Sequence, residues 1–149
     1  MNDAELTAEL VEASAGGGER RNRAAGVAAA IRRFGKYRWV GVYDVGAAEI
    51  AVVGWDGPAP PTHRRFPRSQ GLCGAAVASG APVVVGDVPA DPRYLTTHST
   101  TRSEIVVPVF RGGEVVGLVD VESERPDAFG GGDRRLLERC AALIAPLWR

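Results

Sequence analysis

The sequence predicts an α+β fold in which helices at both ends of the chain enclose a meandering antiparallel sheet. Apolar residues recur at helical spacing near the start, at Val27 and Ile31, and near the end, at Leu136, Cys140 and Leu143. Between these regions, runs rich in valine, tryptophan and tyrosine alternate with turn residues. No internal repeat or linker divides the chain. This order is typical of a layered α+β domain with one core.

Length and charge limit the class of protein. The 149 residues fit one domain, and fractions of 45% hydrophobic and 24% charged residues are ordinary for a globular protein. The 18 basic and 18 acidic side chains cancel. This balance argues against nucleic acid or a membrane surface as partner, because both attract strongly basic faces.

The first residues of the chain, its apolar runs and its cysteines lead us to expect a cytoplasmic protein. The first five residues are acidic and lack the basic and apolar order of a secretory signal. No apolar run approaches the roughly 20 residues of a membrane span. The two cysteines, Cys73 and Cys140, do not make a secreted disulfide framework.

Two helices are expected in the first third of the chain. The first contains Leu6 and ends at residues 16–18, which are three glycines. The second ends at Gly35. We therefore expect residues 1–18 to be a helical extension and residues 19–149 to be the main domain.

Strands and a short helix follow. Residues 38–45 and 49–55 have the composition of strands. The segment 56–67 contains four prolines and is expected to be a surface loop, because proline cannot lie inside a sheet. Ser69 then caps a short helix over residues 70–79.

The second half contains a long loop and a hairpin. Residues 83–85 form a short buried strand, and residues 87–102 form a polar loop of the kind that often carries function. A Gly-Gly pair between residues 104–111 and 114–122 indicates a β-hairpin. Asp133 is the expected N-cap of the final helix.

Four sequence segments resemble one known family. They are residues 38–43 (RWVGVY), 71–76 (GLCGAA), 103–109 (SEIVVPV) and 117–123 (GLVDVES). In order and spacing they are similar to the GAF fold and, more narrowly, to the small free methionine-(R)-sulfoxide reductases. The resemblance implies a central antiparallel sheet of about five to six strands. It also implies N- and C-terminal helices on one face and a ligand pocket under loops on the other.

The family reduces free methionine sulfoxide with three cysteines, and this chain lacks two of them. One recycling cysteine corresponds to Cys73, but the catalytic position falls at Thr97 and the other recycling position at or near His63. Sulfoxide reduction by this route needs a thiolate to attack sulfur and a second thiol to resolve the adduct. A threonine hydroxyl cannot replace the thiolate. If the protein is an enzyme, the resemblance implies an oxidoreductase related to L-methionine (R)-S-oxide reductase.

Three acidic residues form the main candidate site, and the resemblance maps the family's substrate-pocket acids onto them. Asp120 and Glu122 share one face of a strand. A two-residue hairpin turn would pair Glu104 with Val121 and point it to the opposite face, whereas a three-residue loop would make it face Asp120. The resemblance favours the clustered arrangement. The alternative is that all three are solvated charges at strand ends.

Other candidates surround this cluster. Trp39 and Tyr43 can wall a pocket, although Trp39 is equally suited to core packing, and Tyr94 is a candidate lid residue. The candidate ligand-binding residues are Trp39, Tyr43, Tyr94, Thr97, Ser103, Glu104, Asp120 and Glu122. The candidate catalytic residues are Cys73, Glu104, Asp120 and Glu122.

The two cysteines have different expected roles. Cys73 lies near the start of a helix, where the helix N-terminus favours the thiolate, so it is a candidate reactive thiol. Its alternative role is a small apolar filler between helix and sheet. Cys140 lies on the apolar face of the last helix and is expected in the core.

The two histidines, His63 and His98, lie in the loops that bracket the expected pocket. Together with Glu104 or Asp120 they could bind a divalent or ferrous metal ion. Their spacing matches no compact metal motif, so solvated loop histidines are the default and no cofactor is otherwise expected.

The leading hypothesis is a small-molecule-binding protein whose pocket accepts a free amino acid or similar zwitterion. Three alternatives remain open. One is an active reductase that relies on Cys73, and another is a metal-dependent enzyme that uses His63, His98 and the acidic cluster. The third is a module that forms a homodimer through its terminal helices.

Overall fold

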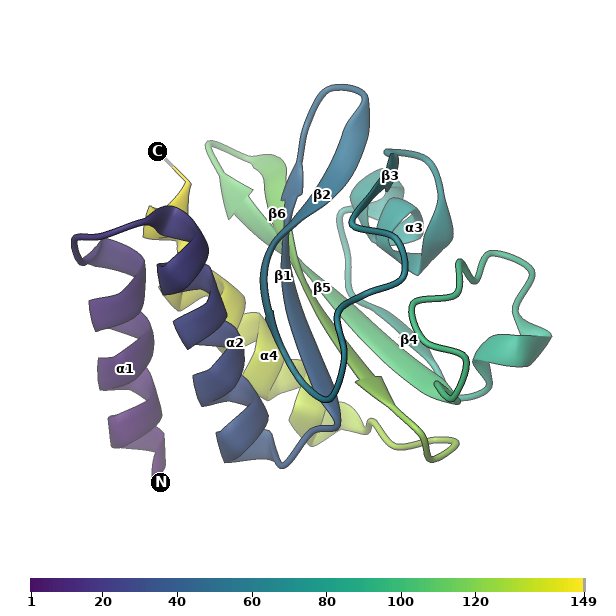
Figure 1. The fold of residues 1–149 in the computed structure, drawn as a ribbon, viewed down its shortest axis with the longest axis horizontal. Helices are drawn as coiled ribbons and strands as arrows, with labels where there is room; N and C mark the ends of the chain where they lie inside the picture. The colour runs from purple at the N-terminus through teal and green to yellow at the C-terminus, as the bar shows by residue number, and fades with distance from the viewer. Residues whose placement is uncertain (149) are drawn as a thin grey trace.

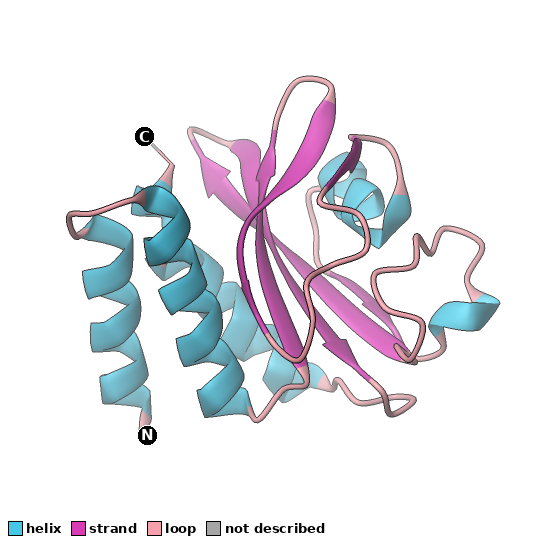
Figure 2. Cartoon of the chain, viewed as in Figure 1, coloured by secondary structure: helices cyan, strands magenta, loops and turns pink. Residues whose placement is uncertain are grey.

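Six antiparallel strands form one curled sheet at the centre of the molecule (Figures 1 and 2). The computed structural model describes residues 1–148 of the chain. In order, the elements are α1 (Asp3–Ala15), α2 (Arg20–Gly35), β1 (Trp39–Val45), β2 (Glu49–Asp56), β3 (Arg65–Pro67), α3 (Gly71–Ser79), β4 (Val83–Val85), the 3₁₀ turn η1 (Val88–Ala90), β5 (Ser103–Arg111), β6 (Glu114–Ser123), α4 (Gly131–Leu143) and the 3₁₀ turn η2 (Ala145–Leu147). The strand order across the sheet is β3-β2-β1-β6-β5-β4.

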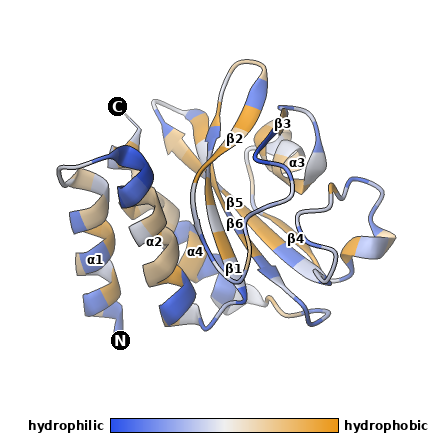
Figure 3. Cartoon of the chain, viewed as in Figure 1, coloured by the Kyte–Doolittle hydropathy of each residue, from blue (hydrophilic) through white to orange (hydrophobic). Residues whose placement is uncertain are grey.

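The sheet separates two hydrophobic clusters. Helices α2 and α4 pack on one face, and α1 packs outside them (Figure 1). Strand residues alternate between the faces, so Val40 and Val42 face these helices, whereas Trp39 and Tyr43 face α3 and the loops. Apolar stretches run along the strands (Figure 3). The predicted α+β layers, with terminal helices on one face and loops on the other, are confirmed.

A bulge in the β5–β6 hairpin sets the register of the strands. Gly112 and Gly113 form a two-residue turn with φ of 58° and 78°, the left-handed values that a type I′ turn requires. Beyond the turn, Phe110 pairs with Val115 but Val109 pairs with Gly117, which leaves one extra residue, Val116, on β6. Every pair beyond the bulge is therefore shifted by one residue.

Three local expectations were wrong. Residues Arg65–Pro67, expected in a loop, form the edge strand β3, where proline is tolerated at the end of the pairing. Helix α3 begins at Gly71 after Gln70, so Ser69 does not cap it. Asp133 is the third residue of α4 rather than its N-cap. Its carboxylate accepts the Gly130 N–H at 2.9 Å, which still satisfies a free donor at the helix start.

Helix α1 and Trp148, near the two ends of the described chain, are packed onto the domain. Helix α1, within the expected extension 1–18, buries Leu6 and Leu10 against the helical layer. Near the C-terminus, the Trp148 Nε1–H donates to Asp44 at 2.7 Å, and Arg20 forms two hydrogen bonds to the same carboxylate. Within residues 1–148, no helix has the length and apolar character needed to cross a membrane.

Gly54 allows α2 to approach β2 closely, and replacing it should destabilise the fold. A β-carbon there would lie 2.7 Å from the Ala24 carbonyl carbon and 2.9 Å from the Ala25 Cα. We expect Gly54→Ala to lower the free energy of unfolding by about 1–3 kcal/mol in urea denaturation. Gly132→Ala is the matched control, because a β-carbon there meets no atom within 4 Å and alanine favours helix. Equal stability of Gly54→Ala and the wild type would contradict this packing.

Candidate functional site

Three carboxyl groups lie together on the buried face of β5 and β6 that faces α3. Glu104 pairs directly with Glu122 across the two strands, and Asp120 follows on the same face of β6. Their relative exposures are 3%, 1% and 1% for Glu104, Asp120 and Glu122. Because of the bulge, Glu104 pairs with Glu122 rather than with Val121. The structure thus brings the three acids together although the hairpin turn has only two residues.

Each of these carboxyl groups has one oxygen atom without a hydrogen-bond partner in the described chain. Within residues 1–148, Glu104 Oε1, Asp120 Oδ1 and Glu122 Oε2 are buried and accept no hydrogen bond. In the same part of the chain, no arginine or lysine forms an ion pair with them. A buried carboxylate without a partner is costly, so Glu104 and Asp120 must take up a proton or a cation from outside.

Burial favours the protonated forms. Removal from water raises the pKa of Glu104 well above its usual range, and the negative charge of Glu122 adds to this. Burial likewise raises the pKa of Asp120, and the negative charges of Glu104 and Glu122 raise it further. Glu104 and Asp120 therefore hold protons that exposed carboxyl groups would lose.

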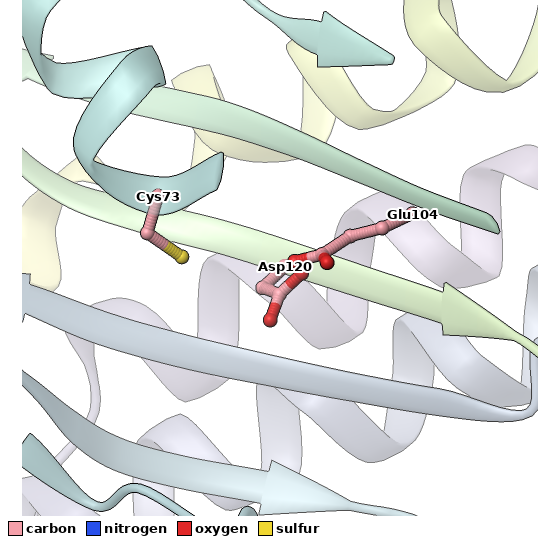
Figure 4. A group of neighbouring side chains, drawn as sticks. All are labelled: Cys73, Glu104 and Asp120. Carbon is pink, nitrogen blue, oxygen red and sulfur yellow. The ribbon is translucent and has the colours of Figure 1, made fainter. Parts of the chain in front are cut away.

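The thiol of Cys73 joins this cluster from α3. Its side chain points toward Asp120, whose carboxyl group lies beside that of Glu104 (Figure 4). The Cys73 Sγ and one carboxyl oxygen from each of Glu104 and Asp120 lie within 4.8 Å of one another. Burial raises the pKa of Cys73 well above its usual value, and the charges of Glu104 and Glu122 act in the same direction. Burial and these acids thus oppose the effect of the helix N-terminus and favour the second role expected for Cys73, a small filler between helix and sheet.

Two loops close over the acids. The Thr101 hydroxyl donates to Glu122 Oε1 at 2.8 Å, and His98 Nδ1 lies 3.9 Å from the same oxygen. The Glu122 carboxylate raises the pKa of His98, against a smaller opposing effect of burial. The backbone N–H and hydroxyl of Thr62 both donate to the Thr97 carbonyl, at 3.0 and 2.6 Å. The loop before β3 is thereby tied to the loop before β5.

The space beneath these loops is small. A cavity of about 10 Å³ is lined by residues that include Tyr43, Cys73, Glu104 and Asp120. A neighbouring cavity of about 90 Å³ is lined in part by Glu122. Pockets for small molecules usually measure about 300–1,000 Å³, whereas about 10–15 Å³ holds one water molecule. The loops must therefore move apart before an organic ligand can reach the acids.

The structure brings most of the predicted ligand-binding residues to these cavities. Tyr43 and Thr97 line the smaller cavity, and Trp39 lines the larger one. The Tyr94 hydroxyl lies 3.4 Å from both the Thr97 nitrogen and the His98 carbonyl oxygen, so this tyrosine supports the closed loop.

Ser103 lies away from the site. It follows Arg102 at the start of β5, on the face opposite to Glu104. Its hydroxyl donates to the Arg125 carbonyl at 2.6 Å and accepts from the Ala128 N–H at 3.3 Å. These bonds hold the connection between β6 and α4.

The two histidines do not meet. His63 lines the smaller cavity and His98 the larger one, where its ring packs edge-on to Trp39 with the centroids 5.1 Å apart. Sequence reasoning missed Thr101, the hydrogen-bond donor to Glu122. In the sequence, the one feature that could have indicated Thr101 is its position in the polar loop, two residues before β5.

Comparisons with known proteins give a consistent assignment. Residues 19–146 match the family model of the GAF domain. GAF domain-containing protein A of Dictyostelium discoideum is 31% identical over 121 residues, which cover 80% of this chain and 75% of that protein. The structure of free methionine-R-sulfoxide reductase from Neisseria meningitidis in complex with its substrate is 32% identical, with a TM-score of 0.85 over 97% of this chain and 87% of that one. The type II free methionine-R-sulfoxide reductase from Thermoplasma acidophilum is also 32% identical, with a TM-score of 0.78 over 87% of this chain and 94% of that one.

Removing one acid from the cluster should stabilise the protein. Because the pKa of Glu104 is raised on folding, its ionisation opposes folding at neutral pH but not below its usual value of 4.5. We expect Glu104→Gln to raise the melting temperature at about pH 8 by on the order of 3 °C, or about 1 kcal/mol. The gain should shrink as the pH falls toward about 4.

Thermal melts in EDTA, followed by circular dichroism, measure this effect. Glu114→Gln is the control, because Glu114 is an exposed residue of the same hairpin. A lower melting temperature for Glu104→Gln at both pH values would mean that the carboxylate has a partner that stabilises it.

Proposed function

We propose that this chain, which belongs to the GAF domain family and is related to the free methionine-R-sulfoxide reductases, binds a free amino acid or similar small zwitterion. We also propose that it does not run a three-cysteine reductase cycle. One observation carries the proposal. Glu104, Asp120 and Glu122 are buried together, and each has an oxygen atom that accepts no hydrogen bond within residues 1–148.

An ammonium group fits this cluster in charge and in hydrogen bonding. It offers three donors, and Glu104 and Asp120, which line the same cavity, each have an oxygen without a donor among the described residues. Glu122 lines the neighbouring cavity and adds a third such oxygen beside them. Hydrogen bonds between ionised groups are stronger than neutral ones, above all away from water. Trp39 and Tyr43 add aromatic surface on the same side of the sheet, which suits the apolar part of an amino acid.

The cysteines do not support the reductase cycle. Cys73 lies between α3 and the sheet, whereas Cys140 lies in the cluster under the terminal helices, so the sheet separates them. They cannot form a disulfide without unfolding. The resemblance assigns the catalytic cysteine to the position of Thr97, whose hydroxyl cannot supply the attacking thiolate.

The closed loops favour a second candidate, a protein-interaction or homodimerising module. A cavity of about 10 Å³ at the acids does not accept an amino acid in this conformation. Amino-acid binding requires the hydrogen bonds between Thr62 and Thr97 to break, and the new bonds to the ammonium group must offset that loss. The unpartnered acids favour the first candidate, since an interaction module has no need of them.

Isothermal titration calorimetry tests the binding of amino acids. We expect free amino acids to bind in EDTA-containing buffer and their N-acetyl derivatives, which lack the ammonium group, to bind at least about tenfold more weakly. Glu122→Gln should weaken binding by a similar factor, because one charged acceptor is lost. The exposed Glu114→Gln variant should bind like the wild type.

Equal binding of the free and acetylated forms would contradict recognition of the ammonium group. If none of the common amino acids or their sulfoxides binds, the interaction module replaces this proposal.

A reductase assay tests the missing chemistry. With free methionine-R-sulfoxide and dithiothreitol, we expect the wild-type protein to form no methionine above the protein-free rate. Thr97→Cys should gain turnover, because a thiol then attacks the sulfoxide sulfur and dithiothreitol reduces the resulting sulfenic acid. Thr96→Cys is the matched control, since it adds a thiol one residue away. Turnover by the wild type that disappears in Cys73→Ser would instead establish a reductase that relies on Cys73.

A further inference from the structure

We infer that the protein, with its loops closed, binds one zinc-class divalent metal ion through Cys73, Glu104 and Asp120 (Figure 4). The inference goes beyond the proposed function, because it concerns the conformation that does not accept an amino acid. It also differs from the metal site expected at the two histidines, which line separate cavities.

The geometry of the three side chains is close to that of a metal site. They come from α3, β5 and β6, three elements that pack together. Their nearest ligand atoms lie within 4.8 Å of one another. Bonds of about 2.0–2.3 Å in a tetrahedral site place ligand atoms about 3.5 Å apart. Small side-chain rotations therefore bring the thiol and the two carboxyl groups onto one ion.

The unpartnered oxygens are an independent indication of a cation. Glu104 Oε1 and Asp120 Oδ1 are buried without a hydrogen-bond donor in the described part of the chain. Glu122 is not one of the three proposed ligands, but its Oε2 is also buried without a hydrogen-bond donor in that part of the chain. Glu122 pairs directly with Glu104 across the two strands. The cavity of about 10 Å³ that the three ligands line has space for one ion.

The donor set selects the kind of ion. Magnesium and calcium prefer oxygen ligands, whereas thiolate sulfur favours zinc and its neighbours among the transition metals. The imidazole of His63, another ligand type of zinc, lines the same cavity. When the metal–ligand bonds form, the Cys73 proton and the protons held by Glu104 and Asp120 pass to solvent, and no electron transfer is needed.

The ion and an amino acid compete for the same acids. An ammonium group and a metal ion both require Glu104 and Asp120, so each should lower the apparent affinity of the other. The ion fits the cavity that the closed loops leave, whereas the amino acid would select the open form.

Cobalt(II) is the probe for this site, because a cobalt–thiolate bond absorbs in the near ultraviolet. Full-length protein dialysed against EDTA and freed of chelator is titrated with cobalt(II). We expect one ion per chain with a thiolate-to-cobalt band, and stoichiometric zinc(II) should displace it. Cys73→Ser should lose the band, and Asp120→Asn should bind at least about tenfold more weakly. The controls are Cys140→Ser, which removes the other cysteine, and Glu114→Gln, and both should retain the band.

Three results would overturn the inference: no cobalt bound to the wild type, a band that persists in Cys73→Ser, or a band that Cys140→Ser removes. Circular dichroism of each variant shows whether it is folded. Calorimetry with amino acids in EDTA tests the proposed function alone, so the two ideas can fail separately.

Discussion

Glu104 and Glu122 face one another across β5 and β6 inside the protein, with Asp120 beside them, and the fold supplies no arginine or lysine to neutralise them within residues 1–148. Like charges directly opposite on neighbouring strands oppose folding, and burial increases the effect. The domain tolerates this because the layers of α2 and α4 on one face and α3 on the other bury a large apolar core. The acids are a local cost that the rest of the fold offsets, which is the usual condition of a binding site.

A single extra residue creates this arrangement. Without the bulge at Val116, the two-residue glycine turn would place Glu104 opposite Val121 and send its carboxyl group into the helical core. With the bulge, the Glu104 side chain lies on the same face of the sheet as Asp120 and Glu122. Bulges next to functional sites commonly redirect a side chain in this way. The closed loops complete the site, since Thr101 binds one Glu122 oxygen and leaves the other without a donor.

The sequence predicted the order of helices and strands because helical and strand periodicities are local signals. It could not predict the bulge, since neither Pro108 nor Val116 marks the extra residue by type. Strand β3 was missed because it forms only by pairing with β2, in which Glu49 lies opposite Pro67. At this edge of the sheet a proline is tolerated. The position of Ser103 was predictable: it precedes Glu104 in one strand, so alternation places the two on opposite faces. The resemblance supplied Cys73 and the three acids as candidates, but their contact needed the tertiary structure, because Cys73 meets the acids only through the packing of α3.

Both proposed ligands, the ammonium group and the metal ion, require buried acids that remain protonated until a cation from outside the chain replaces the proton. Carbon-13 NMR of the side-chain carboxyl groups, titrated with acid and base, measures this directly for Glu104 and Asp120. We expect both resonances, in EDTA, to titrate well above the ordinary value of about 4 and to take the ionised shift at neutral pH when a cationic ligand is added. Two resonances that titrate near 4, without any added cation, would contradict this expectation.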